Sequence, residues 1–465
     1  MLHTASMIDT AYVWSALGGD PALLSRVTAV ERPGVLRARL PVREAAGACV
    51  GACALAAAEL GARRAGGGGV PEVRVDDGAV ATAFVSERHL LVGGRAAESF
   101  APLSRFWRTA DGWVRTHANY PHHRDRLLAA LGLPRDPEPG PGEPAAVLAE
   151  RSAREVEETV YAAGGLAVAL RTPGEWAAHE QAAALRSRPL VERERLDASP
   201  ARVLTRVGRD PLLPAAGLRV LDLTRVVAGP VATRTLALLG ADVLRVDAPW
   251  LPELPDQHAD TGFGKRSARL DLEADRDTFE ELLATADVVV TGYRPGALDR
   301  FGLTPRALAR RRPGVVVAQL SAWGAYGPWA GRRGFDSLVQ VATGIAAVEG
   351  TEGRPGALPA QALDHGSGYL LAAGVLRALT DQADEGGSRL VRVALARTAA
   401  WLLEGGTERA DAPEAGEVPP GPWLAGTDSP LGGLRYVLPP VTFAGGPRDW
   451  ARPPGRWGAD PARWV

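Results

Sequence analysis

Hydrophobic residues in the C-terminal half of the chain change their spacing in a regular way. The apolar-rich run Leu218–Leu223 is typical of a buried parallel strand. Ala232, Leu236 and Leu239 then recur at helical spacing, and Val243–Val246 is again typical of a strand. Because Pro230 suits the first turn of a helix and Gly240 suits its end, we predict a compact strand–helix–strand unit here.

The same alternation continues beyond this unit. We predict helices over Phe279–Leu283 and Pro305–Arg311, strands over Asp287–Val290 and Val315–Leu320, and a long helix that begins near Gly366. Strands that alternate with helices indicate a parallel sheet covered by helices on both faces. The predicted fold class is therefore α/β and Rossmann-like. A ligand is expected at the carboxyl ends of its strands.

The N-terminal half contains a weak internal repeat. Residues 40–58 align with residues 358–379, and a Val-Arg-Val triplet follows each stretch. The alignment puts Arg43 opposite Asp364, so the two copies differ at an acidic position. We interpret the first copy as a degenerate version of the second.

Composition restricts the class of protein. The chain has 465 residues, 46% of them hydrophobic, and a net charge of −1, which permits several packed domains and disfavours general nucleic-acid binding. We expect no membrane span, no signal peptide and a cytoplasmic location. Cys49 and Cys53, one helical turn apart, are interpreted as small buried core residues.

Histidines and the single lysine are candidates for specific chemistry. His117, His122 and His123 cluster near Asp125, but their spacing matches no familiar zinc pattern, so we predict a surface loop and no metal site. Of the 53 basic residues, 52 are arginine and only Lys265 is lysine. In such an arginine-rich chain, this single lysine is a candidate for a specific role.

Five stretches between residues 217 and 400 resemble a known family when they are taken together and in order. They read VLDLTRVVAGP, LGADVLRVD, GKRSARLDL, ADVVVTGYRPGALDRFGL and ALDHGSGYLLAAGVLRAL. In these motifs the chain resembles the family III CoA-transferases, which include formyl-CoA, carnitine and bile-acid CoA-transferases. The resemblance implies that family's fold, a Rossmann-like domain with a smaller α+β domain.

The resemblance also suggests how the chain is divided. Residues 1–102 are interpreted as a degenerate copy of the family's middle region, and 103–212 as the small α+β domain. Residues 213–403 would form the Rossmann-like CoA-binding and catalytic domain, and 404–465 an extended C-terminal tail. Since family members are interlocked homodimers, this chain is expected to be either a homodimer or a self-contained pseudo-dimer.

The resemblance implies a covalent mechanism in which an aspartate attacks the acyl-CoA and then carries CoA itself. Asp364 matches that nucleophile, and Gly366 and Gly368 would let a substrate approach backbone N–H groups that stabilise an oxyanion. Read without the resemblance, Asp364 is a helix N-cap. His365 would either assist a proton transfer or be a satisfied polar residue.

The resemblance further implies that acyl-CoA and a carboxylic acid are the substrates, and that no cofactor is tightly bound. The chain departs from the family at Val227, Gly292 and Ala248, where some members have Gln, Asn and Arg. The identity of the acid substrates is therefore left open. The CoA-binding residues that it implies are Val227, Ala228, Lys265, Tyr293, Arg300 and Arg333.

Three alternatives are weighed against this interpretation. The degenerate first copy and unusual domain order suit a non-catalytic CoA-binding or partner subunit. Related 2-methylacyl-CoA racemases use a Gly-His-Asp motif, but here Gly334-Phe335-Asp336 lacks the basic histidine. An NAD-binding fold is disfavoured because no G-x-G-x-x-G motif follows the first strand.

Overall fold

A seven-stranded sheet forms the centre of the protein, described from a computed structural model that covers residues 7–98, 100–135, 140–407 and 418–465. Six neighbouring strands are parallel, and the last one at one edge is antiparallel. In spatial order the strands are β11 (Arg266–Arg269), β10 (Asp242–Asp247), β9 (Arg219–Leu223), β12 (Val288–Thr291), β13 (Val316–Ser321), β14 (Arg389–Ala394) and β8 (Glu192–Arg195).

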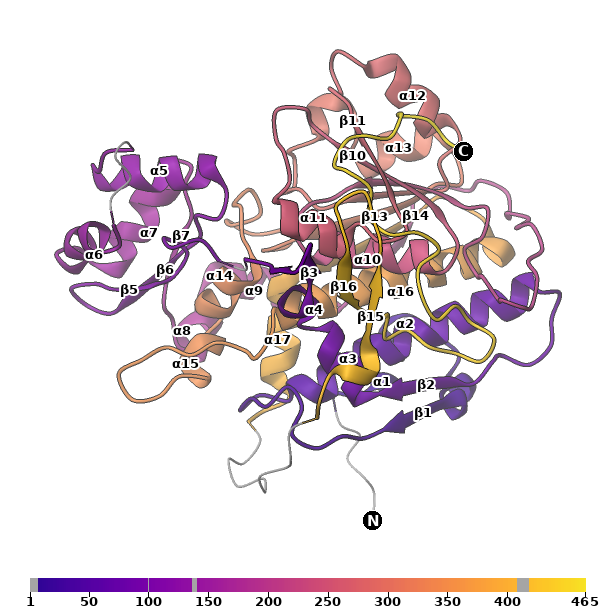
Figure 1. Cartoon of the computed structure of the whole chain (residues 1–465), viewed down its shortest axis with the longest axis horizontal. Coiled ribbons are helices and arrows are strands. Elements are labelled where there is room, and N and C mark those ends of the chain that lie inside the picture. The colour runs from indigo at the N-terminus through magenta and orange to yellow at the C-terminus, as the bar shows by residue number, and fades with distance from the viewer. Residues whose placement is uncertain (1–6, 99, 136–139, 408–417) are drawn as a thin grey trace.

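Helices cover both faces of this sheet, which confirms the predicted α/β class (Figure 1). Val288 and Val290 of β12 pack on one side with α10 (Ala228–Leu238) and α16 (Ala362–Glu385). The alternate residue, Val289, packs on the other side with α12 (Arg276–Ala284) and α13 (Pro305–Arg311). Because strand side chains alternate between faces, strands buried on both sides appear as continuous apolar runs.

The long helix α16 starts earlier than predicted. It begins at Ala362 rather than near Gly366, so Asp364 lies within its first turn instead of before it. Helix α2 (Val42–Arg64) lies alongside α16, and both are almost entirely buried in the same core. The two stretches that the internal repeat aligns are therefore neighbours in space.

The elements around α2 follow a similar order to those around α16. Strands β1 (Val27–Val30) and β2 (Val73–Asp76) are parallel, with α2 between them and α3 (Asp77–Ala83) after them. In the same way β14 follows α16 and leads into α17 (Leu395–Glu404). The order helix, strand, helix is thus shared, while an internal duplication stays a prediction.

Helix α2 also bears on the expected absence of a membrane span. Within the described residues, it alone has the length and apolar composition that a spanning helix needs. In the folded chain, however, 83% of that apolar stretch is buried against other parts of the protein. A buried core helix passes the same test of length and composition.

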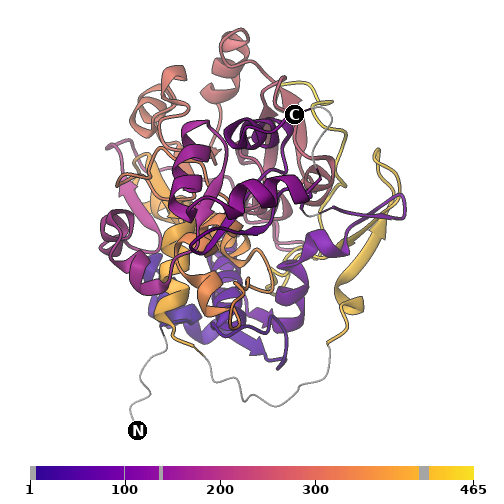
Figure 2. The same cartoon turned by 90° about the vertical axis from the view of Figure 1, so that its left-hand side faces the viewer.

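A smaller group of elements projects from one side of the large sheet (Figures 1 and 2). Its three antiparallel strands pack against helices around a separate apolar cluster that includes Trp107, Val114 and Leu127. Strand β8, although within the predicted 103–212 segment, belongs to the large sheet. The group comprises β5 (Phe106–Arg108), β6 (Trp113–Thr116), β7 (Ala167–Ala169), α5 (Pro121–Leu131), α6 (Gly142–Ala149) and α7 (Ala153–Ala162).

The described part of the C-terminal tail is more structured than an extended segment. Strands β15 (Leu424–Thr427) and β16 (Leu434–Val437) extend the hairpin of β3 (Leu91–Val92) and β4 (Arg95–Ala96). The last residues then cross the free edge of β11, where Asp460 exchanges hydrogen bonds with Ser267. Covering an edge strand in this way protects it from pairing with another chain.

Shorter helices and turns connect these units. They are α1 (Thr10–Ala16), η1 (Pro21–Arg26), α4 (Ser86–His89), α8 (Pro173–Ala177), α9 (Glu180–Arg186), α11 (Pro255–Thr261), η2 (Asp299–Phe301), α14 (Asp336–Ala342), α15 (Ile345–Val348) and η3 (Gly421–Trp423).

Candidate active site

A cavity of about 560 Å³ lies at the carboxyl ends of β9 and β12. From β9 the chain builds the sheet outward through β10 and β11, whereas β12, β13 and β14 extend it the other way. Such a reversal of strand order leaves a crevice where ligands of α/β proteins bind. The residues Arg225, Val226 and Ala228 after β9 face Gly292 and Tyr293 after β12 across this cavity.

Asp364 lines the cavity from the first turn of α16 and is almost fully buried. Its backbone N–H donates to Oδ2 of Asp336 at 2.9 Å, so Asp336 satisfies a helix N–H that would otherwise lack a partner. The other oxygen of Asp336 accepts from the Gln340 amide at 2.5 Å. Within the described residues, Oδ2 of Asp364 is buried without a hydrogen-bond partner.

Burial and neighbouring carboxylates make ionisation of Asp364 unfavourable. Burial, followed by the charges of Asp336 and Glu87, raises the pKa of Asp364 well above its usual value. Burial also raises the pKa of Asp336 to about 6, although its hydrogen bonds act in the opposite direction. Two carboxyl groups this close do not ionise independently, so the pair holds at least one proton more readily than isolated aspartates do.

His365 points to a different neighbourhood from Asp364. Its ring stacks on Phe84 at 5.3 Å between centroids, and its Nε2 lies 3.8 Å from Oε2 of Glu87. Burial opposes the ionisation of Glu87, but the hydrogen bond and charge of His365 outweigh it and lower the pKa of Glu87. His365 is thus engaged with the N-terminal half of the chain and does not line the cavity.

Arginines give the cavity a positive potential. Arg225 and Arg332 also line it, but both have carboxylate partners, in Glu253 and Glu157. Arg333, by contrast, has no acidic group within 4.0 Å among the residues that the structure describes. Burial and the charges of Arg294 and Arg126 lower its pKa. Positive charges that repel one another in this way favour an anionic ligand.

The loop after β9 is held in an unusual conformation. Val226 has a φ of +72°, a left-handed value that β-branched residues rarely adopt. Its N–H donates to the buried carboxylate of Glu253, which also accepts from Tyr120 and Arg245. Backbone strain that neighbouring contacts maintain is common at functional sites. Here Glu253 connects the strained loop to Tyr120 in the small group of elements.

The structure brings part of the predicted site together. Asp364, Ala228, Tyr293 and Arg333 all line the cavity. Val227 lies beside it as the buried residue before α10. Burial raises the pKa of Tyr293 to about 12, which keeps its hydroxyl neutral. The predicted residues at the cavity thus come from four separate segments of the sequence.

Lys265 and Arg300 lie outside the cavity. Lys265 is buried beneath α10, with its ammonium group 3.0 Å from both Oδ2 of Asp222 and the carbonyl oxygen of Pro230. Burial lowers its pKa to about 8, while Asp222 favours the charged form. Arg300 packs its guanidinium over the ring of Phe301. In these positions neither side chain faces the residues that line the cavity.

The two predicted oxyanion glycines serve helix packing in this conformation. Both lie inside α16, where their N–H groups belong to helical turns, and neither lines the cavity. A Cβ atom on Gly368 would lie 2.6 Å from the carbonyl oxygen of Ala228, so Gly368 permits close contact between α16 and α10. Gly366 faces Sγ of Cys49 on α2.

Sequence reasoning missed the contribution of the small group of elements. The prediction of a surface loop for the histidines was wrong, because His117 and His123 are buried and His122 and His123 line the cavity. His117 stacks on Phe335 at 3.6 Å between centroids. Burial lowers the pKa of His123 to about 2, so it is neutral. In the sequence, only the aromatic rings close to Tyr120 could have indicated that this segment contributes to the cavity.

The sequence profile of CoA-transferase family III matches residues 215–421, which contain most of the large sheet and Asp364. This region belongs to CoA-transferase family III. An acetyl-coenzyme A transferase of Hypoxylon pulicicidum is 37% identical over 202 residues, which are 42% of this chain and 34% of that protein. The residues before 215 and after 421 lie outside this family match.

Two bacterial relatives show a similar extent of agreement. A probable fatty acyl-CoA transferase of Mycobacterium tuberculosis is 36% identical over 209 residues, 42% of this chain and 53% of that protein. A formyl-CoA:oxalate CoA-transferase of Streptomyces coelicolor is 35% identical over 193 residues, 38% of this chain and 47% of that protein. A crystal structure of the mycobacterial protein aligns with 42% of this chain and 57% of that chain, with a TM-score of 0.40. This chain spans between a third and about half of these curated relatives' lengths.

Proposed function

We propose that the protein is a CoA-transferase that moves CoA from an acyl-CoA donor to a carboxylic acid acceptor. The observation that carries the proposal is the position of Asp364. This buried carboxyl group, with an oxygen that has no hydrogen-bond partner among the described residues, lies in the wall of the cavity at the sheet's reversal point. The family III region and the relatives named as CoA-transferases support the same function.

The proposed chemistry balances without a cofactor. A carboxylate oxygen of Asp364 attacks the thioester carbonyl carbon, the C–S bond breaks, and CoA leaves as a thiolate. The thiolate attacks the aspartyl carbonyl of the mixed anhydride, which releases the donor acid and leaves an aspartyl-CoA thioester. The acceptor carboxylate then attacks this thioester and expels the thiolate once more. Attack of that thiolate on the acceptor's acyl carbon forms the new acyl-CoA and frees Asp364.

The surroundings of Asp364 suit this sequence of steps. The anionic groups of CoA would be attracted to Arg333, Arg294 and Arg126. Burial withholds solvation from the ionised nucleophile and keeps water away from the anhydride. Asp336 orients the first turn of α16 through its hydrogen bond to the Asp364 N–H. We therefore assign Asp336 as a positioning residue for the nucleophile.

Intact-mass measurement after mixing the protein with a panel of acyl-CoAs tests the covalent step. We expect an acyl- or CoA-sized adduct that hydroxylamine removes, and none in Asp364→Asn. CoA binding without an adduct for any donor would instead support a non-catalytic CoA-binding subunit. The same panel identifies the donor acid, because only a productive acyl group yields the adduct.

We also propose that one chain supplies the complete site. Glu87 and Phe84 from the N-terminal half contact His365, beside Asp364, while Tyr120, His122 and His123 line the cavity from the small group of elements. These segments precede the family III region in the same chain. A self-contained pseudo-dimer would therefore need no residue from a second copy to enclose its substrate.

A further inference from the structure

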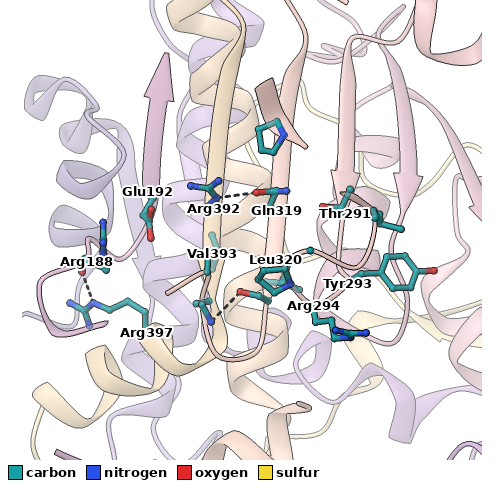
Figure 3. Close-up of a pocket in the computed structure, with 18 of the residues that line it drawn as sticks. Arg188, Glu192, Thr291, Tyr293, Arg294, Gln319, Leu320, Arg392, Val393 and Arg397 are labelled. Carbon is teal, nitrogen blue, oxygen red and sulfur yellow. Dashed lines mark hydrogen bonds between the residues drawn. The ribbon is translucent and has the colours of Figure 1, made fainter. Parts of the chain in front are cut away.

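A second cavity of about 190 Å³ is lined in part by the loop that follows β12 (Figure 3). Tyr293, Arg294, Leu320 and Ser321 line both cavities and form the wall between them. None of the residues assigned to the transfer reaction, apart from this shared wall, takes part in the second cavity. The proposed transfer chemistry therefore does not account for its lining.

A row of polar side chains forms the floor of this cavity. Thr291, Gln319, Arg392 and Glu192 are direct neighbours in register across β12, β13, β14 and β8, so they project from the same face of the sheet. Further from the carboxyl edge, the same face carries apolar residues such as Val317. This face of the sheet thus changes from apolar to polar where the cavity opens.

The cations in this cavity have few acidic partners. Arg392 donates to the side-chain amide oxygen of Gln319 at 3.0 Å and to the Tyr326 hydroxyl at 3.4 Å, both of them neutral groups. The Arg188 guanidinium lies 3.6 Å from the centre of the Tyr326 ring. In the described parts of the chain, neither arginine has an acidic group within 4.0 Å. Partly buried cations without counter-charges favour an anion beside them.

The remaining charges of the lining offset this positive potential only in part. Arg397 is paired with Glu404, and the Glu192 carboxylate accepts a hydrogen bond from Tyr326. Asp299 and Arg294 lie in the exposed loop at the rim. Among the described residues the cavity therefore contains two arginines with no acidic group within 4.0 Å, against the one carboxylate of Glu192 in its floor. It also offers the Gln319 amino group, which faces away from Arg392 because the amide oxygen faces it (Figure 3).

The other walls of the cavity are apolar. Leu185, Leu190, Leu298, Leu303 and Val393 contribute to them. A purely inorganic anion would leave these side chains without a partner, whereas a short alkyl chain would bury them. The volume is below the roughly 300–1,000 Å³ of sites for drug-sized ligands. A ligand with one anionic head and a tail of a few carbons matches this lining.

We propose that this second cavity is a binding site for a short-chain carboxylate anion, held by Arg392, Arg188 and Gln319 with its alkyl chain against the leucines. Binding involves no covalent step and does not depend on the transferase activity. The shared wall of Tyr293 and Arg294 places the bound acid next to the cavity that contains Asp364.

Ligand-observed NMR titration with sodium butyrate, butyramide and inorganic phosphate tests this site. We expect butyrate to bind, and the neutral isostere butyramide and phosphate to bind at least about tenfold more weakly, because one lacks the charge and the other the tail. Equal binding of butyrate and butyramide, or tighter binding of phosphate, would overturn the proposal. The full-length chain is used without any CoA, so turnover plays no part in the result.

Two variants locate the binding. Arg392→Gln and Gln319→Glu should each weaken butyrate binding about tenfold or more. In Gln319→Glu the new carboxylate takes the place of an oxygen already 3.0 Å from Arg392 Nε, so it neutralises the arginine and supports the fold. Arg276→Gln on α12 and Arg333→Gln in the first cavity are the controls and should leave butyrate affinity unchanged. Loss of binding in Arg333→Gln alone would place butyrate beside Asp364 and overturn the proposal.

Discussion

At the scale of single residues, burial and charge at Asp364 determine when the site can react. The carboxyl group must lose its proton before it attacks a thioester, and its surroundings oppose that loss through burial and through Asp336 and Glu87. We expect the rate of adduct formation to rise with pH across the neutral range, as the ionised fraction of Asp364 increases. Single-turnover mass spectrometry at a series of pH values measures this rate.

Replacing Glu87 should move that pH profile. Glu87→Gln removes one of the negative charges that raise the pKa of Asp364, so the midpoint of the rate profile should shift to lower pH. Glu155→Gln, an exposed glutamate on α7, is the matched control and should leave the midpoint where it is. An upward shift in Glu87→Gln would contradict this electrostatic account.

The same carboxyl group should limit the stability of the native fold. Because its pKa is higher in the folded than in the unfolded chain, its contribution is fully present below the unfolded pKa, near 4, and declines as pH rises toward the folded value. Asp364→Asn cannot ionise and avoids this decline. The variant's melting temperature, relative to the natural chain, should therefore increase between pH 5 and pH 8. A constant difference over that range would show that folding does not raise the pKa of Asp364.

Lys265 and Arg333 should affect different properties, although the resemblance predicted both as CoA contacts. Lys265→Met leaves the buried carboxylate of Asp222 without its charge partner, a change that costs about 3–5 kcal/mol in comparable pairs. For Lys265→Met we expect lower thermal stability with little change in CoA affinity.

Arg333→Gln should weaken CoA binding while the melting temperature stays near that of the natural chain. Calorimetric CoA titration and thermal unfolding distinguish the two, and reversed effects would restore the original assignment of Lys265.

At the scale of secondary-structure elements, the N-terminal half of α16 depends on close contact with two other helices. Gly368 touches α10 and Gly366 faces α2, but the space at the two positions differs. An added Cβ would lie 2.6 Å from the Ala228 carbonyl oxygen at position 368, and 3.5 Å from Cys49 Sγ at position 366. The first distance requires a helix to shift, whereas the second is ordinary van der Waals contact.

A pair of alanine substitutions tests this difference. Gly368→Ala should lower the free energy of unfolding by about 1–3 kcal/mol, the usual effect of overpacking. Gly366→Ala should be neutral or stabilising by up to about 1 kcal/mol, because alanine favours helix more than glycine does. Denaturant unfolding of both variants provides the measurement. Equal destabilisation would mean that the two glycines are packed equally tightly, against the difference in their surroundings.

At the scale of the whole molecule, residues far apart in sequence enclose the candidate site. Tyr120, His122 and His123 come from the small group of elements, Arg225 from the loop after β9, and Asp364 from α16. If one chain completes the site, two chains with different defects cannot repair each other. If two chains share it, a mixed dimer restores one intact site.

Co-expression of two inactive chains distinguishes these arrangements. One chain carries Asp364→Asn, and the other carries alanine at Tyr120, His122 and His123. We expect the purified mixture to show no more transferase activity than the sum of the separate variants. Recovery of activity in the mixture would show that the site is completed between chains.

The sequence by itself determined the alternation of strands and helices in residues 217–400 and the candidate nucleophile. Strand and helix periods are local properties of side-chain spacing, so β9, α10 and β10 could be predicted from a window of thirty residues. The start of α16 could not, because its first turn is supported by Asp336, which lies 28 positions earlier. Local patterns cannot show which distant acid completes a helix terminus.

Only the tertiary structure decided which polar residues reach the cavity. Lys265 and the histidines have similar polar signals in the sequence, yet Lys265 is buried against Asp222, and His122 and His123 face Asp364's cavity. Burial and long-range pairing depend on how the small group of elements packs against the sheet, which no local pattern encodes. The second cavity is likewise the product of register between β12, β13, β14 and β8, where four ordinary polar residues become neighbours only after the sheet has formed.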